Sequence, residues 1–444
     1  MISKRPQNSH RVIMSVLLGV ATVAIFTTAS CAVIRGEGGG QPASSYSADS
    51  ANRWFDLAYT LTRSESISPP VASRAFAYMG VALYESVLPG MPQHRSLADQ
   101  VNGELEVPEA DEGATYSWPL VANAALASIT PLFYKSEKSY VAIGSLQSEI
   151  RGELAKDISS EVVFQSEERG RTVGSAIARW ALGDGYDSLK GCAYTPATFD
   201  GAWSLTPPAY ADAIEPCWGR LRPFALDSIA AFRPPPPPAF SESVTSEIYL
   251  QAKEVYDTAK NRTPQQRATA AYWADGPGTT GTPAGHSISI VSQLVRERNN
   301  TLEFAAEAYA RVGIAVADGF ISCWEAKYAY NYLRPVTYIQ LMIDPEWLSM
   351  LNTPPFPEYP SGHSVQSSAA AEVLAALFGP GPFVDRTHEA RGLGSRSYES
   401  FADAAKEASI SRLYGGIHFR PALDIGLEQG KSIGQAVNEL LWTK

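Results

Sequence analysis

The sequence predicts an all-α protein, a helical bundle with long irregular loops. Apolar residues recur at helical spacing through most segments after residue 51, and alternating β-branched runs are few. The chain has 444 residues, of which 45% are hydrophobic and 18% charged, a composition typical of a folded globular protein. No internal repeat divides it. We therefore expect a single large helical domain over residues 51–444.

Apolar spacing predicts helices at these positions: 70–87, 120–130, 162–182, 243–260, 286–298, 302–333, 364–378, 401–414 and 427–441. The segment 183–240 interrupts the pattern, because it contains Pro207-Pro208 and five consecutive prolines at 234–238. Proline cannot sit inside a long helix. This segment is either a domain boundary or a covering loop, and we interpret it as a covering loop.

The first thirty residues are typical of an export signal, with a basic start, an apolar run at 12–26 and small residues before Cys31. Thr28-Ala29-Ser30-Cys31 is also similar to a bacterial lipoprotein box, so a lipid anchor at Cys31 and simple secretion both stay open. The Gly/Ser-rich residues that follow predict a flexible tether over 31–50. We expect the protein in the bacterial periplasm or cell envelope, or secreted.

The charge balance argues against nucleic acid and anionic membranes as partners. The chain has 36 basic and 46 acidic residues, a net charge of −10, and such a surface repels polyanions. In an oxidising compartment, Cys192 and Cys217 of the covering loop are either a disulfide or two unpaired core residues. Cys323 lies in an apolar stretch and is expected in the core.

Two cations mark the end of the predicted helix 302–333. Lys327 and Arg334 are seven residues apart, which places them on one stripe of a helix, and Pro335 is expected to end that helix. Aromatic neighbours such as Trp324 are not those of a solvated face. The pair therefore suggests a binding site, with a basic surface edge as the alternative.

The proline-rich residues 354–363 open onto the next predicted helix. Backbone N–H groups and the helix dipole attract anions at a helix start, where Ser361 adds a hydroxyl and Gly362 allows close approach. His363 would lie beside such an anion and suits general acid/base work. The alternative is a serine N-cap with an incidental histidine.

A third segment, 411–418, ends another predicted helix. Arg412 offers a fork suited to oxyanions, and His418 is a possible nucleophile or metal ligand. The alternative is a helix-ending arginine with a surface histidine. Three other histidines lack a comparable setting and are expected at the surface or in the core: His94, His286 and His388.

Together these segments resemble the vanadium-dependent haloperoxidase and type 2 phosphatidic acid phosphatase superfamily. The family pattern is Lys, six residues, Arg-Pro; then Pro-Ser-Gly-His; then Ser-Arg, five residues, His, and all three parts occur here in that order. The segment 272–276, Tyr-Trp-Ala-Asp-Gly, also looks like the haloperoxidase branch. The resemblance implies a helical bundle of that type, with the anion-binding core at about 270–444.

The resemblance also implies roles for individual residues. The vanadate oxygens would be bound by Lys327, Arg334, Ser361, Gly362 and Arg412. His418 would be the axial vanadium ligand, His363 the acid/base group, and Asp275 the carboxylate that orients Arg412. Trp324 and Phe356 match substrate-pocket positions of the chloroperoxidase type.

The implied activity is oxidation of halide by hydrogen peroxide at vanadate, with Lys327 polarising the peroxide. The alternative is an acid phosphatase that hydrolyses phosphate monoesters through a phosphohistidine, with phosphate in the same site. Ala422 departs from the pattern, because the superfamily usually has Asp there, four residues after the last histidine; Asp424 lies six after it. This departure disfavours the phosphatase. A tethered anion-binding protein is disfavoured too, since a binder needs no acid/base histidine.

Overall fold

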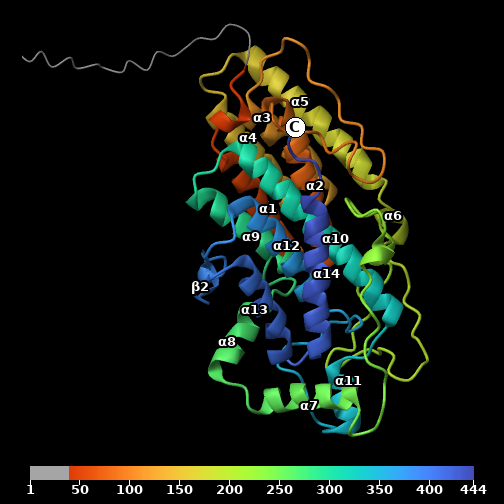
Figure 1. Ribbon diagram of the computed structural model, residues 1–444. Coiled ribbons are helices and arrows are strands. Elements are labelled where there is room, and N and C mark those ends of the chain that lie inside the picture. Colours follow the sequence, from red (N-terminus) through yellow and green to blue (C-terminus); the bar gives the residue numbers. More distant parts are fainter. Residues whose placement is uncertain (1–39) are drawn as a thin grey trace, which may run out of the picture. The chain divides into compact units, whose positions relative to one another are not determined.

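A bundle of α-helices dominates the computed structural model, which describes residues 40–444 (Figure 1). The helices are α1 (Asp49–Ser64), α2 (Pro69–Val87), α3 (Trp118–Ile129), α4 (Glu137–Leu154), α5 (Ser160–Leu182), α6 (Tyr186–Leu189), α7 (Glu247–Lys260), α8 (Pro264–Tyr272), α9 (Thr282–Glu297), α10 (Leu302–Tyr330), α11 (Pro335–Met342), α12 (Gly362–Phe378), α13 (Phe401–Tyr414) and α14 (Arg420–Asn438). In this described part the one sheet is antiparallel, β1 (Phe383–Asp385) with β2 (Arg396–Tyr398). The prediction of an all-α protein is confirmed.

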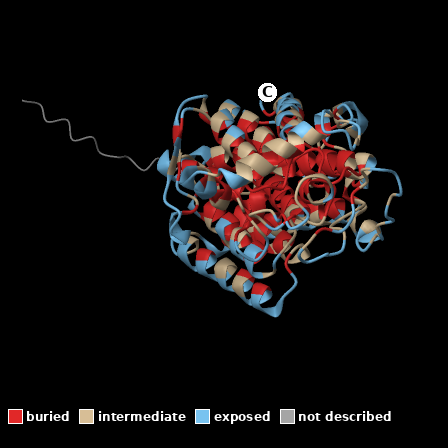
Figure 2. Cartoon of the chain, turned by 90° about the horizontal axis from the view of Figure 1, so that it is seen from below, coloured by how far each residue is buried: buried red, intermediate tan, exposed pale blue. Residues whose placement is uncertain are grey.

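Short 3-10 helices occupy several connections: η1 (Ala43–Ser45), η2 (Leu88–Gly90), η3 (Thr130–Leu132), η4 (Trp218–Arg220), η5 (Ile229–Phe232) and η6 (Glu389–Arg391). The long helix α10 lies at the centre of the bundle, where it packs against α2 and α12 (Figure 1). Most of its side chains are buried, and Figure 2 shows the buried residues gathered inside a shell of exposed ones. The core therefore surrounds α10, whose last turn carries Lys327.

Helix α12 packs tightly against α14 because glycines line the contact. Gly426, Gly430 and Gly434 follow one another every four residues along α14, on the face that meets α12. A Cβ atom at Gly430 would lie 2.1 Å from the Val365 carbonyl oxygen, which leaves no room for a side chain. This close contact fixes the start of α12 beside the segment that carries His418.

Each predicted helix is present, with ends shifted by several residues, while α1, α4, α8, α11 and the short α6 were missed. The prediction that one helix carries both Lys327 and Arg334 is wrong. Helix α10 ends at Tyr330, because Asn331 adopts a left-handed conformation with φ 48°. Arg334 is instead the N-cap of α11, and Pro335 begins that helix rather than ending one.

The predicted covering loop 183–240 contains only α6, η4 and η5, so its irregular character is confirmed. Cys192 and Cys217 form a disulfide within it. Ile214 attaches the loop to the body: its N–H donates to the Pro355 carbonyl at 3.0 Å, and its own carbonyl accepts bonds from the side chains of Trp324 and Tyr328. The loop therefore covers the end of α10.

The predicted export signal, 1–30, and Cys31 lie outside the described residues. The predicted tether does not extend through residues 43–50, because that segment packs on the body: Ala43 is fully buried, and the Leu302 N–H donates to the Tyr46 carbonyl at 2.9 Å. Cys323 is buried in the core, as expected. Of the helices in the described part, none combines the length and apolar character needed to cross a bilayer.

Candidate active site

The predicted site residues come from separate elements and meet at one end of α12. Lys327 lies on the last turn of α10, and Ser361 is the N-cap of α12. Arg412 lies near the end of α13, and His418 lies in the short connection between α13 and α14. The hydrogen bonds described below connect these segments through the loop 354–360.

Lys327 and Arg334 are both fully buried and fix the backbone of this loop. The Lys327 ammonium donates to the carbonyls of Pro357 and Glu358, each at 2.9 Å, and to that of Pro360 at 2.5 Å. The Arg334 guanidinium donates to the Phe356 carbonyl at 2.9 Å. Two cations, one on the last turn of α10 and one at the N-cap of α11, thus hold one loop.

Burial of three cations close together makes this part of the protein strongly electropositive. Burial, together with the charge of Arg334, lowers the pKa of Lys327 to about 7, although Cys323 and Glu358 oppose the shift. Burial likewise lowers the pKa of Arg334 to about 10 and that of Arg412 to about 9. Buried like charges are costly unless an anion compensates them, so the arrangement favours anion binding. The Nε of Arg412 is buried without a hydrogen-bond partner among the described residues.

The start of α12 adds polar groups to this site. The Ser361 hydroxyl accepts a hydrogen bond from the Ser364 N–H at 3.4 Å, and the first N–H groups of a helix have no partner within it. Because Gly362 has no side chain, it also permits a contact that was not predicted. A Cβ atom there would lie 3.3 Å from the Trp324 ring, so glycine lets that ring pack against the helix start.

His418 is held in a single tautomer. Its Nδ1 lies 2.8 Å from a carboxylate oxygen of Glu358, which accepts the ring N–H and also the Phe419 N–H at 2.9 Å. Its Nε2 lies 3.2 Å from Nη1 of Arg334, and guanidinium can only donate, so Nε2 carries the lone pair. Burial, and then the nearby cations, place the pKa of His418 well below its usual value. His418 is therefore neutral and offers Nε2 to a ligand.

Glu358 was missed by the sequence analysis, which considered carboxylates only after His418, at positions 422 and 424. Ala422 has no carboxylate, and Asp424 is exposed, so neither fills that role. Glu358 stands three residues before Ser361, inside the proline-rich segment 354–363, and an acidic residue within that segment was the available signal. A metal-ligating histidine commonly donates its other N–H to a carboxylate in this way.

His363 is oriented by the backbone of Trp273. Its Nε2 lies 3.0 Å from the Trp273 carbonyl oxygen, which can only accept, so Nε2 carries the proton and Nδ1 the lone pair. Burial, and then the charge of Arg412, lower the pKa of His363 well below its usual value. The same carbonyl accepts a bond from Nη1 of Arg412 at 2.8 Å. One backbone oxygen therefore positions both side chains.

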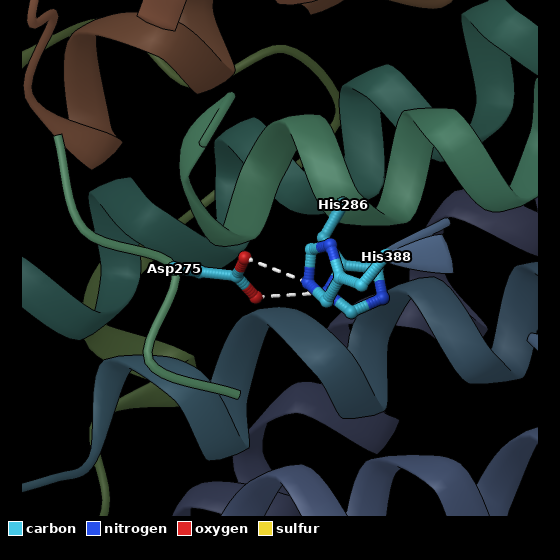
Figure 3. Close-up of side chains that lie close together, drawn as sticks. All are labelled: Asp275, His286 and His388. Atoms are coloured by element: carbon cyan, nitrogen blue, oxygen red, sulfur yellow. Dashed lines mark hydrogen bonds and ion pairs between the residues drawn. The ribbon is translucent and has the colours of Figure 1, made fainter. Parts of the chain in front are cut away.

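Asp275, which was expected to orient Arg412, makes no hydrogen bond to it in the described part of the chain, although its charge acts to raise the pKa of Arg412. The Asp275 carboxylate instead lies 2.8 Å from Nδ1 of His286 and 3.1 Å from Nε2 of His388 (Figure 3). All three side chains are buried, so the expectation of a surface or core position for the two histidines is met, but their pairing with Asp275 was not foreseen. They offer ligand atoms within 4.8 Å of one another, as some metal sites do.

Trp324 and Phe356 form an aromatic wall beside the cations. Their ring centres are 4.8 Å apart, and both side chains are buried. The charged groups of Lys327 and Arg334 lie 5.1 and 4.9 Å from the centre of the Phe356 ring, within the range of cation–π attraction. The wall therefore adds packing and electrostatic support to the cation pair.

Comparison with known proteins gives consistent relatives. Residues 307–442 match the family model described as the VCPO second helical-bundle domain. Vanadium chloroperoxidase of Curvularia inaequalis is 28% identical over 165 residues; the match covers 31% of this chain and only 27% of that protein's length.

Two solved structures extend the comparison over nearly the whole chain. The first bacterial vanadium-dependent iodoperoxidase is 37% identical, covers 90% of this chain and 98% of its own, and superposes with a TM-score of 0.84. A holo-type bacterial vanadium-dependent chloroperoxidase shares the fold at 18% identity, with a TM-score of 0.64 over 85% of this chain and 93% of its own. The identity and coverage of the first of these structures show that the chain belongs to the vanadium-dependent haloperoxidase family.

Proposed function

We propose that this protein oxidises halide with hydrogen peroxide at a vanadate held by His418. The observation that carries the proposal is the convergence of three buried cations, Lys327, Arg334 and Arg412, on a neutral histidine whose Nε2 carries a lone pair that faces Arg334. Such a site suits a tetrahedral oxyanion that also accepts a nitrogen ligand. The names of the relatives, vanadium chloroperoxidase and vanadium-dependent iodoperoxidase, support vanadate as that anion.

The residues fit this anion. Lys327, Arg334 and Arg412 would neutralise its oxygens, with the hydroxyl of Ser361 and the N–H of Gly362 at the start of α12 as further donors. When bound, vanadate(V) supplies a Lewis acid that activates hydrogen peroxide toward halide without a change in oxidation state. These contacts would be in place before peroxide arrives, because the side chains are already fixed by the hydrogen bonds described above.

Proton transfer falls to His363. Because its Nε2–H is donated to the Trp273 carbonyl, Nδ1 is the nitrogen that accepts a proton from hydrogen peroxide and later returns it. The lowered pKa of His363 keeps the ring neutral and ready to accept. Overall, hydrogen peroxide, halide and one proton give hypohalous acid and water, with the halide oxidised and the O–O bond broken.

A phosphomonoesterase is the second candidate, and one observation favours it. The departure at Ala422 no longer counts against it, because Glu358 supplies the carboxylate that holds His418. In that reaction, Nε2 of His418 would attack phosphorus and His363 would protonate the leaving oxygen. Phosphate would then occupy the site that we assign to vanadate.

The test compares both reactions on one preparation of residues 40–444, which include the whole described body. Reconstitution with orthovanadate should give bromide- or iodide-dependent halogenation that excess phosphate inhibits. A His418→Ala variant should lose both vanadate binding and turnover. Hydrolysis of an aryl phosphate that vanadate inhibits, without halogenation, would replace this proposal by the phosphatase. Comparing iodide, bromide and chloride would establish the halide preference.

We further propose that the chain is exported, with a lipid anchor at Cys31 or as a secreted form. The disulfide between Cys192 and Cys217 supports export, since disulfides persist in oxidising compartments. Mass spectrometry of the amino-terminal peptide from the native host distinguishes a diacylated Cys31 from an unmodified terminus. An uncleaved chain in the cytosolic fraction would contradict both forms.

A further inference from the structure

A buried chain of charged groups lies behind Arg412 and His363. His286 on α9 stands between two carboxylates: Asp275 in the loop after α8, and Asp385 at the end of β1. Its Nδ1 lies 2.8 Å from Asp275 and its Nε2 lies 2.8 Å from Asp385. His286 and Asp275 are each 2% exposed and Asp385 is fully buried, so water does not compensate these charges.

Both ring nitrogens of His286 have the geometry of hydrogen-bond donors. Nδ1 faces a carboxylate oxygen of Asp275, and Nε2 faces one of Asp385 together with the Thr387 hydroxyl oxygen at 2.9 Å; an ionised carboxylate only accepts. The Thr387 N–H and hydroxyl also donate to Asp385, which keeps that carboxylate ionised. Burial alone would lower the pKa of His286, but the two carboxylates outweigh it and raise the pKa to about 10.

A metal ion is the alternative occupant of this cluster. It would coordinate Asp275, His286 and His388, whose ligand atoms lie within 4.8 Å of one another. The direct line from Nδ1 of His286 to Asp275 is only 2.8 Å long, however. Two ligand atoms bound about 2 Å from one ion at a tetrahedral angle would lie about 3.3 Å apart, whereas 2.8 Å is an ordinary hydrogen-bond length. The spacing therefore fits a shared proton better than a cation.

The cluster is connected to the active site through Trp273. The Trp273 ring stacks on His286, with ring centres 4.6 Å apart and planes inclined by 18°. Its carbonyl is the acceptor shared by Arg412 and His363. Asp275, two residues later, has φ 40°, a conformation that non-glycine residues adopt only when their surroundings impose it. The bonds from His286 provide that constraint.

We propose that His286 is held as an imidazolium between Asp275 and Asp385 and positions Arg412 and His363 through the Trp273 carbonyl. It is a positioning residue, since it contacts no reacting group. The inference rests on the proposed function for the roles of Arg412 and His363. The other titratable or charged groups that face this cluster are Tyr59, Tyr272, Tyr398, His388, Arg396 and, through their charges, His363 and Arg412.

The first test needs neither vanadate nor turnover. Nitrogen-15 NMR of the vanadate-free, histidine-labelled protein should show one histidine with both ring nitrogens protonated at about pH 8, where an ordinary histidine is neutral. A His286→Gln variant should remove that signal. A neutral His286 at this pH would overturn the proposal. So would the binding of one equivalent of divalent metal by the wild-type protein, if the His388→Ala variant no longer binds it.

The second test measures positioning. His286→Gln should weaken vanadate binding about 10- to 100-fold in equilibrium dialysis, as changes of outer partners do in metal sites. Loss of the imidazolium charge should also raise the pKa of His363 and move the acid limb of the halogenation pH profile upward. Asp385→Asn removes a negative charge and should move the acid limb downward. A general folding defect would not shift the limb in opposite directions in the two variants.

His94→Gln is the matched control, because His94 is also buried and pairs with a carboxylate, Glu307, at 3.1 Å, away from the site. It should change neither vanadate affinity nor the pH profile. Wild-type affinity and an unshifted limb in His286→Gln would refute the positioning role. If His286→Gln does not fold, the pH profile of Asp385→Asn and the NMR spectrum of the wild-type protein test the proposal instead. Failure of the wild-type protein to bind vanadate would reject the proposed function but leave the NMR result on His286 standing.

Discussion

Above about pH 7, where Glu358 is ionised, replacing it by glutamine removes the negative charge that holds His418 and keeps the size of the side chain. The carboxylate accepts two hydrogen bonds, from Nδ1 of His418 at 2.8 Å and from the Phe419 N–H at 2.9 Å. A charged hydrogen bond is roughly twice as strong as a neutral one, which contributes about 1 kcal/mol. Loss of the charge therefore costs about 2 kcal/mol, or about 30-fold in vanadate affinity.

Stability should respond differently from binding. Burial raises the pKa of Glu358 from its ordinary 4.5 to about 7, so the folded state holds this proton more tightly than the unfolded chain. The stability that protonated Glu358 contributes is complete at low pH and is lost as the pH rises through 7. Glu358→Gln should therefore bind vanadate more weakly without a lower free energy of unfolding above that pH.

Equilibrium dialysis against vanadate and urea denaturation test the two halves of this prediction. Glu85→Gln is the matched control, because Glu85 is also fully buried, its pKa is also raised to about 7 by burial, and it accepts the Leu97 N–H at 2.6 Å. That variant should keep wild-type vanadate affinity. A Glu358→Gln protein with unchanged affinity would show that this carboxylate does not set the state of His418.

Further predictions concern pH, packing and the disulfide. Burial lowers the pKa of Lys327 to about 7, so above that pH the side chain must take up a proton when vanadate binds. Equilibrium dialysis should therefore show vanadate affinity falling about tenfold per pH unit above about pH 7. Gly430→Ala, whose Cβ would meet the Val365 carbonyl, should lower the free energy of unfolding in urea by about 1–3 kcal/mol. Serine at both Cys192 and Cys217 should lower it by about 3 kcal/mol, since the disulfide closes a 25-residue separation.

Much of the fold follows from local patterns in the sequence. The helices with a broad apolar face, such as α10 and α12, were predicted, because burial on several sides leaves a clear spacing of apolar residues. Helix α4 was missed because only Ser139, Ile143 and Ile150 are buried in it. Helix α8 was missed although Thr263 and Gln266 form a capping box, a sequence pattern typical of a helix start.

The candidate site was predictable only where its residues lie within continuous motifs. Lys327 and Arg334 were found from their spacing, but for a wrong structural reason, since the helix ends between them. The pairing of His286 with Asp275 and Asp385 joins residues that are 11 and 99 positions apart. Contacts of that range depend on how helices pack, and neither residue spacing nor composition encodes them.

The position of Glu358 has a consequence for how related chains are recognised. The Ser361 N–H donates to the Ala422 carbonyl at 3.0 Å, so the loop and the start of α14 are immediate neighbours. A carboxylate reaching His418 from the position of Ala422 would meet Glu358 in a buried space, where like charges repel. The two positions are therefore expected to covary across homologues, with an acid at one and a small neutral residue at the other. A sequence signature that demands the helix-start aspartate would discard chains of this type, although their histidine has an equivalent partner.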